Sequence, residues 1–148
     1  MAKIITLSNH KGGVGKTTSS INIGAGLNKL GKKVLLIDLD PQANLSQSLG
    51  VVDAEKNIYG ALRGFYKLTP IKILKGIDLI PSTLELSGAE IEMIGEPGRE
   101  YILKQTIKPI KHKYDFIIID SPPSLGLLTI NSLTASDEVL IPLQAQFL

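Results

Sequence analysis

The sequence lacks cysteine and tryptophan altogether and contains few aromatic residues. Without cysteine the chain forms no disulfide and offers no thiolate to a metal or an iron–sulfur cluster. Its formal net charge of +2 is too small to indicate nucleic-acid binding by itself. The sequence has no apolar run long enough to cross a membrane and no signal peptide, so we expect a cytoplasmic protein.

The residues that are present give a composition typical of globular proteins, with 43% apolar and 20% charged residues. Strand-like and helix-like segments alternate without an internal repeat or a linker. The expected strands are 4–8, 34–37, 77–80, 116–119 and 138–141. The expected helices are 17–30, 57–62, 84–94, 99–111 and 125–133. This alternation predicts an α/β fold whose mainly parallel sheet is flanked by helices.

A glycine-rich turn, Lys11-Gly-Gly-Val-Gly-Lys-Thr-Thr18, joins the first expected strand to the first expected helix. Glycines let backbone N–H groups approach phosphates closely, and the helix N-terminus adds a partial positive charge. Lys16 can neutralise the outer phosphates, and Thr17 can place its hydroxyl on Mg2+. The alternative is a turn that only connects a strand to a helix. The predicted nucleotide-binding residues are Lys11, Gly12, Gly13, Val14, Gly15, Lys16, Thr17 and Thr18.

Three aspartates follow apolar strands downstream of this turn. Asp120 ends the run 116–119 in a Walker B arrangement, where a carboxylate can hold a water on Mg2+. Asp38 and Asp40 follow the run 34–37, and two carboxylates one residue apart can face a common site in an extended chain. The alternative is that these carboxylates only accept hydrogen bonds from turn amides. The predicted metal-site residues are Thr17, Asp38 and Asp120.

The turn departs from the usual phosphate-loop pattern, G-x-x-x-x-G-K-[ST], at its start. His10 stands where a glycine is expected, and a second lysine, Lys11, precedes the glycines. This combination resembles the deviant Walker A loop of the ParA/MinD family of ATPases. The resemblance implies the P-loop NTPase fold of the nitrogenase iron protein type, with ATP and Mg2+ as cofactors. The nitrogenase iron protein needs cysteines for its cluster, and this chain has none.

The same resemblance implies roles for individual residues. Lys11 is expected to reach the phosphates of a partner subunit, whereas Lys16 acts within its own subunit. Asp40 is expected to support hydrolysis by orienting the attacking water, since phosphoryl transfer depends mainly on positioning and charge stabilisation. Asp38 is expected to help hold the water shell of the metal. The expected catalytic residues are Lys11, Lys16 and Asp40.

Three stretches place the resemblance closest to the ParA/Soj branch. MinD-like chains usually carry glycine soon after the second acid of switch I, whereas this chain has Pro41-Gln-Ala-Asn44. The stretch Ser82-Thr-Leu-Glu-Leu-Ser-Gly-Ala-Glu90 resembles the Soj pattern, as do residues 122–129 together with 137–142. Residues 121–126 resemble the switch II segment of the family.

The ParA/Soj resemblance implies a homodimer when ATP is bound, non-specific DNA binding, and hydrolysis stimulated by a centromere-binding ParB-like protein. The implied role is plasmid or chromosome partitioning, in association with the nucleoid. Two alternatives stay open: a MinD-like positioning ATPase for membrane or surface cargo, and a metabolic enzyme of the synthetase type on the same scaffold. A basic patch, an amphipathic tail or neither after Leu148 would separate the three.

Relatives in the family continue well beyond Leu148, so we interpret residues 1–148 as the N-terminal portion of one P-loop ATPase domain. Its C-terminal strands are missing from this chain, and strand 138–141 would lie beside strand 4–8 as an uncovered edge. We expect the adenine-binding and DNA-binding residues beyond Leu148. Residues 1–148 alone should therefore bind ATP more weakly than the full-length protein.

Overall fold

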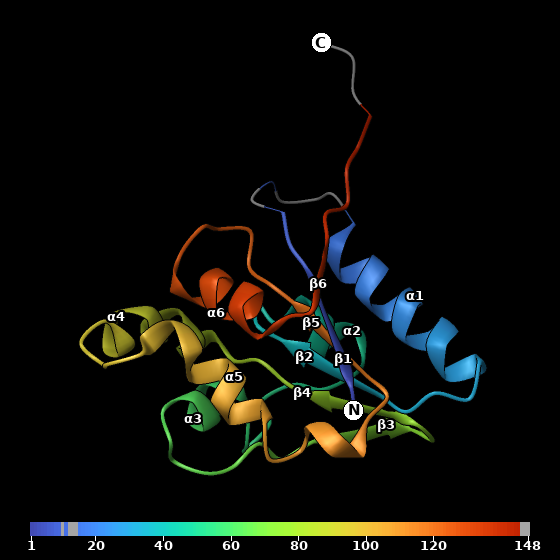
Figure 1. The fold of residues 1–148 in the computed structure, drawn as a ribbon, viewed down its shortest axis with the longest axis horizontal. Coiled ribbons are helices and arrows are strands. Elements are labelled where there is room, and N and C mark those ends of the chain that lie inside the picture. The colour runs from blue at the N-terminus through green and yellow to red at the C-terminus, as the bar shows by residue number, and fades with distance from the viewer. Residues whose placement is uncertain (10, 12–14, 146–148) are drawn as a thin grey trace.

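The computed structural model describes residues 1–9, 11 and 15–145, and helices and strands alternate along it (Figure 1). The strands are β1 (Lys3–Leu7), β2 (Val34–Asp38), β3 (Ile71–Leu74), β4 (Ile77–Ile80), β5 (Phe116–Asp120) and β6 (Glu138–Leu140). The α-helices are α1 (Lys16–Lys29), α2 (Asn44–Ser48), α3 (Ile58–Leu62), α4 (Ala89–Met93), α5 (Ile102–Ile107) and α6 (Leu127–Ala135). Short 3-10 helices span Leu84–Gly88, Arg99–Tyr101 and Lys111–Lys113.

The described strands form one six-stranded sheet in the order β3-β4-β2-β5-β1-β6. Every pairing in this sheet is parallel except that of the edge strand β3 with β4. Figure 1 shows α1 on one side of the sheet and α3, α4, α5 and α6 on the other. The predicted α/β architecture, a mainly parallel sheet flanked by helices, is confirmed.

The central strands are mainly apolar because helices cover both of their faces. All five residues of β2 are buried. On one face, Leu36 and Ile118 pack with Leu45 of α2, and Leu27 of α1 lies against them. The second face carries the larger cluster, which includes Ile37, Ile58, Leu103, Ile107 and Leu128. Two apolar layers therefore hold the sheet between its helices.

The carboxyl ends of the central strands meet at one edge of the sheet. Asp38 at the end of β2 pairs in register with Asp120 at the end of β5, and Asp120 also pairs with Leu7 of β1. Ligands of open α/β sheets bind outside these carboxyl ends. The fold therefore places two predicted metal-site residues side by side, next to the strand that precedes the glycine-rich turn.

Several elements differ from those predicted. The sequence does not predict α2, which is too short to show a helical period, or β3, a four-residue edge strand with an exposed face. The expected helix 84–94 is a 3-10 helix followed by α4, with Gly88 at the junction, where a glycine weakens helical order. The expected helix 99–111 is interrupted as well, and α5 ends before Pro109.

The expected strand 138–141 is β6, and its predicted place beside β1 is confirmed. Ile5 pairs with Glu138 and Leu7 with Leu140, in parallel. β6 is the outer strand of the described sheet and all of its residues are exposed. The backbone N–H of Ile4 donates to Asp137 Oδ2 at 2.8 Å, which secures this edge.

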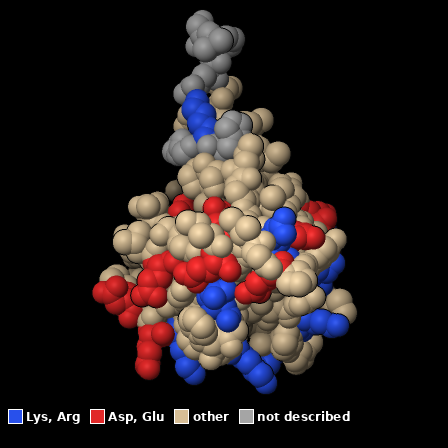
Figure 2. Space-filling model, turned by 90° about the vertical axis from the view of Figure 1, so that its left-hand side faces the viewer, with Lys and Arg blue, Asp and Glu red and all other residues tan. Residues whose placement is uncertain are grey.

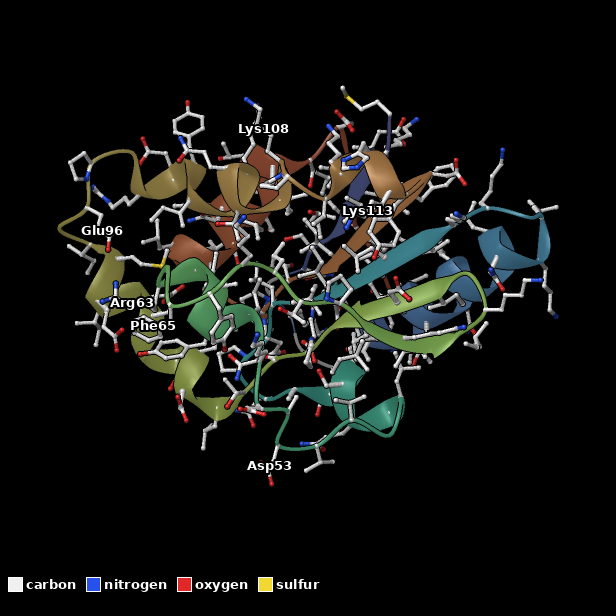
Figure 3. All side chains as sticks on the ribbon, turned by 90° about the horizontal axis from the view of Figure 1, so that it is seen from below. Asp53, Arg63, Phe65, Glu96, Lys108 and Lys113 are labelled. Carbon is white, nitrogen blue, oxygen red and sulfur yellow. The ribbon has the colours of Figure 1, made fainter. Side chains whose placement is uncertain are left out.

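Acidic side chains gather in a band on the side of the molecule where α3 and α4 lie (Figure 2). Arg63, which follows α3, forms ion pairs with two of them, Nε to Glu92 Oε2 at 2.7 Å and Nη1 to Glu96 Oε1 at 3.0 Å. Figure 3 shows Arg63 and Glu96 close together at this end of the molecule. Tyr59 also donates to Glu92 Oε2 at 2.9 Å, so α4 and the turn after it are fastened to α3.

No helix in the described part of the chain has the length and apolar character needed to cross a membrane.

Candidate nucleotide-binding site

The start of α1 forms one wall of the site. Gly15, the residue before this helix, has φ of 81°, in the left-handed region that favours glycine. The first turn of α1 contains no acidic residue, so nothing in that turn opposes the attraction of its N–H groups for an anion. Gly12, Gly13 and Val14 of the predicted loop lie outside the described residues, as does His10. Their part in phosphate binding stays a prediction.

Lys16 and Thr17 converge on Asp120. Thr17 Oγ1 donates to Asp120 Oδ2 at 2.7 Å, and Lys16 Nζ lies 3.9 Å from Asp120 Oδ1. Ser20, one helical turn further along, donates to the Lys16 carbonyl at 2.9 Å and to Asp120 Oδ1 at 3.4 Å. Lys16 and Asp120 are both buried, where charges interact more strongly than in water. The structure thus brings together the lysine, the hydroxyl and the Walker B acid.

Burial also affects the charge state of the acids. It raises the pKa of Asp120, and the neighbouring Asp40 adds to this rise, while the Thr17 hydrogen bond and the Lys16 charge oppose it. Burial likewise raises the pKa of Asp38 to about 6, against the lowering effect of its hydrogen bonds with Ser46. Buried acids this close together repel one another when ionised, so a nearby cation would stabilise them.

Asp38 uses its oxygens within the protein. Its Oδ2 accepts from the backbone N–H of Ser46 at 2.9 Å and from Ser46 Oγ at 2.7 Å. Its Oδ1 accepts from the backbone N–H of Asp40 at 3.1 Å. These contacts agree with the interpretation that Asp38 holds turn amides. Its role in the water shell of a metal stays a prediction.

Asp40 lies across a cavity from the start of α1. Its Oδ1 accepts from the backbone N–H of Gln42 at 3.0 Å. The cavity has a volume of about 390 Å³, and its lining residues are Gly15, Lys16, Thr17, Thr18, Asp40, Asn44 and Pro123. The start of α1, the switch I acid Asp40 and Pro123 of switch II therefore line one cavity. Pockets of this size are typical of small-molecule sites.

Lys11 is placed differently from Lys16. It is exposed, its backbone N–H donates to Asn9 Oδ1 at 2.9 Å, and it is not among the residues that line the cavity. A lysine that acts on the phosphates of a partner subunit need not line its own cavity. The role predicted for Lys11 therefore concerns a dimer rather than this single chain.

Three polar residues of the site, Ser20, Asn44 and Ser46, are not predicted from the sequence. Ser20 lies four residues after Lys16, and helical spacing is a signal that could have revealed it. Asn44 and Ser46 belong to α2, a helix that the sequence does not predict. Asn44 belongs to the stretch Pro41-Gln-Ala-Asn44 that resembles the ParA/Soj pattern, but the sequence does not indicate that it lines the cavity.

A nucleotide with Mg2+ is implied by this type of site, and the donor set fits it. The Thr17 hydroxyl and the Asp120 carboxylate are hard oxygen donors at one point of the site, as Mg2+ prefers. Within the described residues, no group of three or more histidine, aspartate or glutamate side chains could hold a metal alone. In a phosphate-loop site Mg2+ keeps several waters and takes its other ligands from the phosphates.

The raised pKa of Asp38 predicts that the stability of the folded protein depends on pH. Its pKa of about 6 in the folded state exceeds the ordinary value of 3.8, so the folded state binds more protons than the unfolded state between these values. The cost of burying the ionised acid grows as the pH rises through this window and is complete above it. We expect the metal-free Asp38→Asn variant to gain thermal stability relative to the wild type as the pH is raised from about 4 to about 7. A stability difference independent of pH would contradict the raised pKa.

The parallel sheet, the glycine turn at the start of α1 and the Lys16–Thr17–Asp120 contacts define a P-loop nucleotide-binding protein. Residues 2–148 match the family described as an AAA domain, AAA_31. The chain is 49% identical over 152 residues to the sporulation initiation inhibitor protein Soj of Bacillus subtilis. The matched region covers 99% of this chain and 60% of Soj. The chain belongs to the ParA/MinD family of P-loop ATPases, closest to its ParA/Soj branch.

Solved structures give the same result. A plasmid partition protein from Borrelia burgdorferi is 38% identical with a TM-score of 0.89, over 99% of this chain and 67% of that one. Cobyrinic acid a,c-diamide synthase from Mycobacterium smegmatis, with a bound ATP analog and magnesium, is 39% identical with a TM-score of 0.96, over 99% of this chain and 62% of that one. The predicted P-loop fold and family are confirmed. This chain spans about 60% of the length of Soj.

Proposed function

We propose that the full-length protein is a Mg2+-dependent ATPase of the ParA/Soj type, whose ATP-bound form dimerises and acts in plasmid or chromosome partitioning. The observation that carries this proposal is the contact of Lys16 and Thr17 with the buried Asp120, because Lys16 and Thr17 also line one cavity with Asp40. The names of the chromosome-partitioning ATPase Soj of Treponema pallidum, 46% identical to this chain, and of the plasmid partition protein support the biological role.

In this mechanism the N–H groups at the start of α1 and the Lys16 ammonium bind phosphate oxygens. Thr17 and Asp120 would hold Mg2+, which when bound neutralises charge on the phosphates. Asp40 accepts a hydrogen bond from water and orients it toward the terminal phosphate. Its position across the cavity from Lys16 supports this role. Orientation suffices because phosphoryl transfer requires little covalent chemistry from the protein.

A dimer, non-specific DNA and a ParB-like partner belong to the same proposal and rest on the family relationship. The exposure of Lys11 at the rim of the glycine turn supports a role toward a second subunit. In such a dimer, each Lys11 would add positive charge to the phosphates bound by the other chain, which stabilises the charge that develops during transfer.

Replacing Lys11 tests this function in the full-length protein. We expect Lys11→Ala to bind Mg·ATP with an affinity within about threefold of the wild type but to lose ATP-dependent dimerisation. Turnover should fall at least about a hundredfold, as when an enzyme loses a cation supplied by a second subunit. Light scattering with a non-hydrolysable analogue and phosphate release, with and without Mg2+, measure these effects. Lys32→Ala, an exposed lysine after α1, is the control. A Lys11→Ala protein that dimerises and hydrolyses normally would contradict the proposal.

A metabolic synthetase is the second candidate function, favoured by the likeness to the cobyrinic acid a,c-diamide synthase structure. Both functions use the same phosphate-binding residues. They differ in whether ATP consumption needs an acceptor substrate. A synthetase consumes ATP when its acceptor substrate is present, whereas a partitioning ATPase hydrolyses ATP without one. Steady ATP hydrolysis by the full-length protein alone, increased by DNA, would favour the partitioning ATPase.

A further inference from the structure

The segment 82–90 follows β4 and includes the first turn of α4, and it contacts both switch segments of the site. Its first residue, Ser82, reaches switch I, which we define as residues 38–44. Its last residue, Glu90, reaches the helix that follows switch II, residues 121–126. The proposed mechanism above assigns no task to this segment.

Ser82 is tied to both acids of switch I. Its Oγ donates to the Asp40 carbonyl at 2.6 Å, and its backbone N–H donates to Ser46 Oγ at 3.0 Å. Ser46 Oγ in turn donates to Asp38 Oδ2 at 2.7 Å. All of these residues are buried, so each bond is shielded from competition by solvent. The end of β4 thereby fixes the backbone at Asp40.

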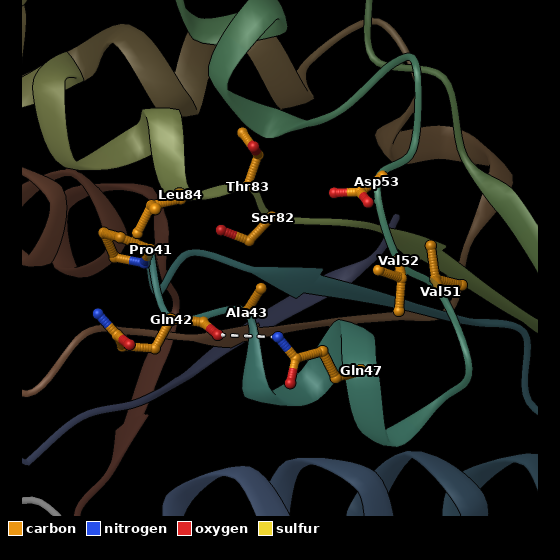
Figure 4. Close-up of a pocket in the computed structure, with 10 residues that line it drawn as sticks. All are labelled: Pro41, Gln42, Ala43, Gln47, Val51, Val52, Asp53, Ser82, Thr83 and Leu84. Carbon is orange, nitrogen blue, oxygen red and sulfur yellow. Dashed lines mark hydrogen bonds between the residues drawn. The ribbon is translucent and has the colours of Figure 1, made fainter.

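Switch I needs such support because its backbone is strained. Ala43 has φ of 55°, in the left-handed region that non-glycine residues seldom adopt, and its N–H donates to the same Asp40 carbonyl at 2.9 Å. Figure 4 shows Ser82, Thr83 and Leu84 facing Pro41, Gln42 and Ala43 across a small cavity of about 260 Å³. A strained conformation persists only where its surroundings hold it, and the Ser82 hydroxyl is part of those surroundings.

Glu90 contacts the start of α6, the helix that follows switch II. Its Oε1 accepts from the backbone N–H of Leu128 at 2.9 Å, in the first turn of α6. Gly126, the residue before α6, has no side chain to cap the helix, and a Cβ there would overlap the Glu90 carboxylate. The carboxylate therefore takes the place of an N-cap side chain. Pro123 of the same switch lines the phosphate cavity.

The segment itself is anchored between its two ends. Leu86 and Ala89 are fully buried in the larger apolar cluster. Just beyond Glu90, the contacts of Glu92 and Glu96 with Arg63 fasten α4 to α3. A displacement of this segment would disturb the core, so the segment is held in place between the two switches.

We infer that Ser82 and Glu90 are positioning residues, and that the segment 82–90 is a brace that holds switch I and switch II in one fixed relation around the phosphate cavity. The inference rests on the proposed ATPase function. Ser82 acts through Asp40, and Glu90 acts through the start of α6.

Substitution of Ser82 in the full-length protein tests the first end of the brace. Ser82→Ala should lower kcat for ATP roughly tenfold, the effect of one net hydrogen bond, with ATP affinity changed less than about threefold. Amide hydrogen exchange at Gln42 and Ala43 should accelerate, while that of the core strand residue Leu36 stays slow. Ser87→Ala is the matched control, because the Ser87 hydroxyl bonds only locally, to the Leu84 carbonyl. Equal kcat and exchange in wild type and Ser82→Ala would overturn the inference.

Substitution of Glu90 tests the second end. Glu90→Ala should lower kcat by a similar factor and accelerate exchange of the Leu128 amide, whereas Glu90→Gln, which keeps an acceptor oxygen, should recover most of the turnover. Glu92→Ala is the control for a general loosening of α4. The double variant Ser82→Ala/Glu90→Ala should lose less than the product of the two single losses, because either change releases the same brace.

The possible failures are distinguishable. If the wild-type protein shows no Mg2+-dependent ATP turnover, the proposed function fails. If the wild type turns over ATP and both single variants match it, the inference about Ser82 and Glu90 fails alone. Strictly multiplicative losses in the double variant would overturn the brace. If a variant loses thermal stability, hydrogen exchange at the Gln42 and Leu128 amides relative to the core still decides whether the switches were released.

Discussion

In the full-length protein, Lys16→Ala should lose most of the stabilisation that Mg·ATP gives to the wild type. We expect this result because the Lys16 ammonium is buried at the start of α1 and faces the cavity into which the glycine turn would bring phosphates. Truncating one member of a buried charge pair weakens binding by about thirtyfold to a hundredfold. At ligand concentrations near 100 times the wild-type Kd, the wild type gains about 2.7 kcal/mol of stability, and a variant that binds thirtyfold to a hundredfold more weakly should gain only about 0.4 to 0.9 kcal/mol.

Thermal unfolding with and without Mg·ATP measures this effect, and calorimetric titration confirms it. Lys29→Ala, at the other end of the same helix and exposed, is the control and should respond to nucleotide like the wild type. The apo form of Lys16→Ala should also be less stable, since Asp120 loses the charge 3.9 Å from its Oδ1. An unchanged nucleotide-induced stabilisation in Lys16→Ala would remove Lys16 from the phosphate site.

Asp40→Ala is expected to separate binding from hydrolysis. In the proposed mechanism α1 and Lys16 hold the phosphates from another wall of the cavity, so Mg·ATP affinity should change little. Turnover should fall about a hundredfold or more, the cost of losing the position of a reacting group, and the ATP-bound dimer should persist. Single-turnover phosphate release and a dimer lifetime measurement test the two halves of this expectation.

Asp40→Asn is the matched variant for this test. Its side-chain oxygen still accepts from the Gln42 N–H, so the turn keeps its bond while the charge is lost. If Asp40 orients water through its charge, Asn is as slow as Ala. If Asp40 is only a turn residue, Asn restores turnover and the proposed role is wrong.

Much of the nucleotide-binding site is predictable from the sequence because its signals are local. The glycine turn, Lys16 and Thr17 are contiguous, and Asp120 ends an apolar run. An apolar strand followed by a helix also predicts that the strands are parallel, which brings their carboxyl ends to one edge. The pairing of Asp38 with Asp120 depends on parallel strands and also on β2 lying next to β5. The family resemblance predicted only one neighbour pair of the sheet, strand 138–141 beside strand 4–8.

The sequence by itself determined the class of this protein, because a phosphate loop is built from residue types at a fixed spacing within a short stretch. Only the tertiary structure decided which partners the acids have. Asp38 is bonded to Ser46, the Asp40 carbonyl to Ser82, and the start of α6 to Glu90, over separations of 8, 42 and 38 residues. Such contacts depend on how strands and connecting segments pack against one another, and serine and glutamate carry no periodic signal that marks them in advance. The same sequence positions become parts of one site because folding brings their backbone groups within hydrogen-bonding distance in a buried region.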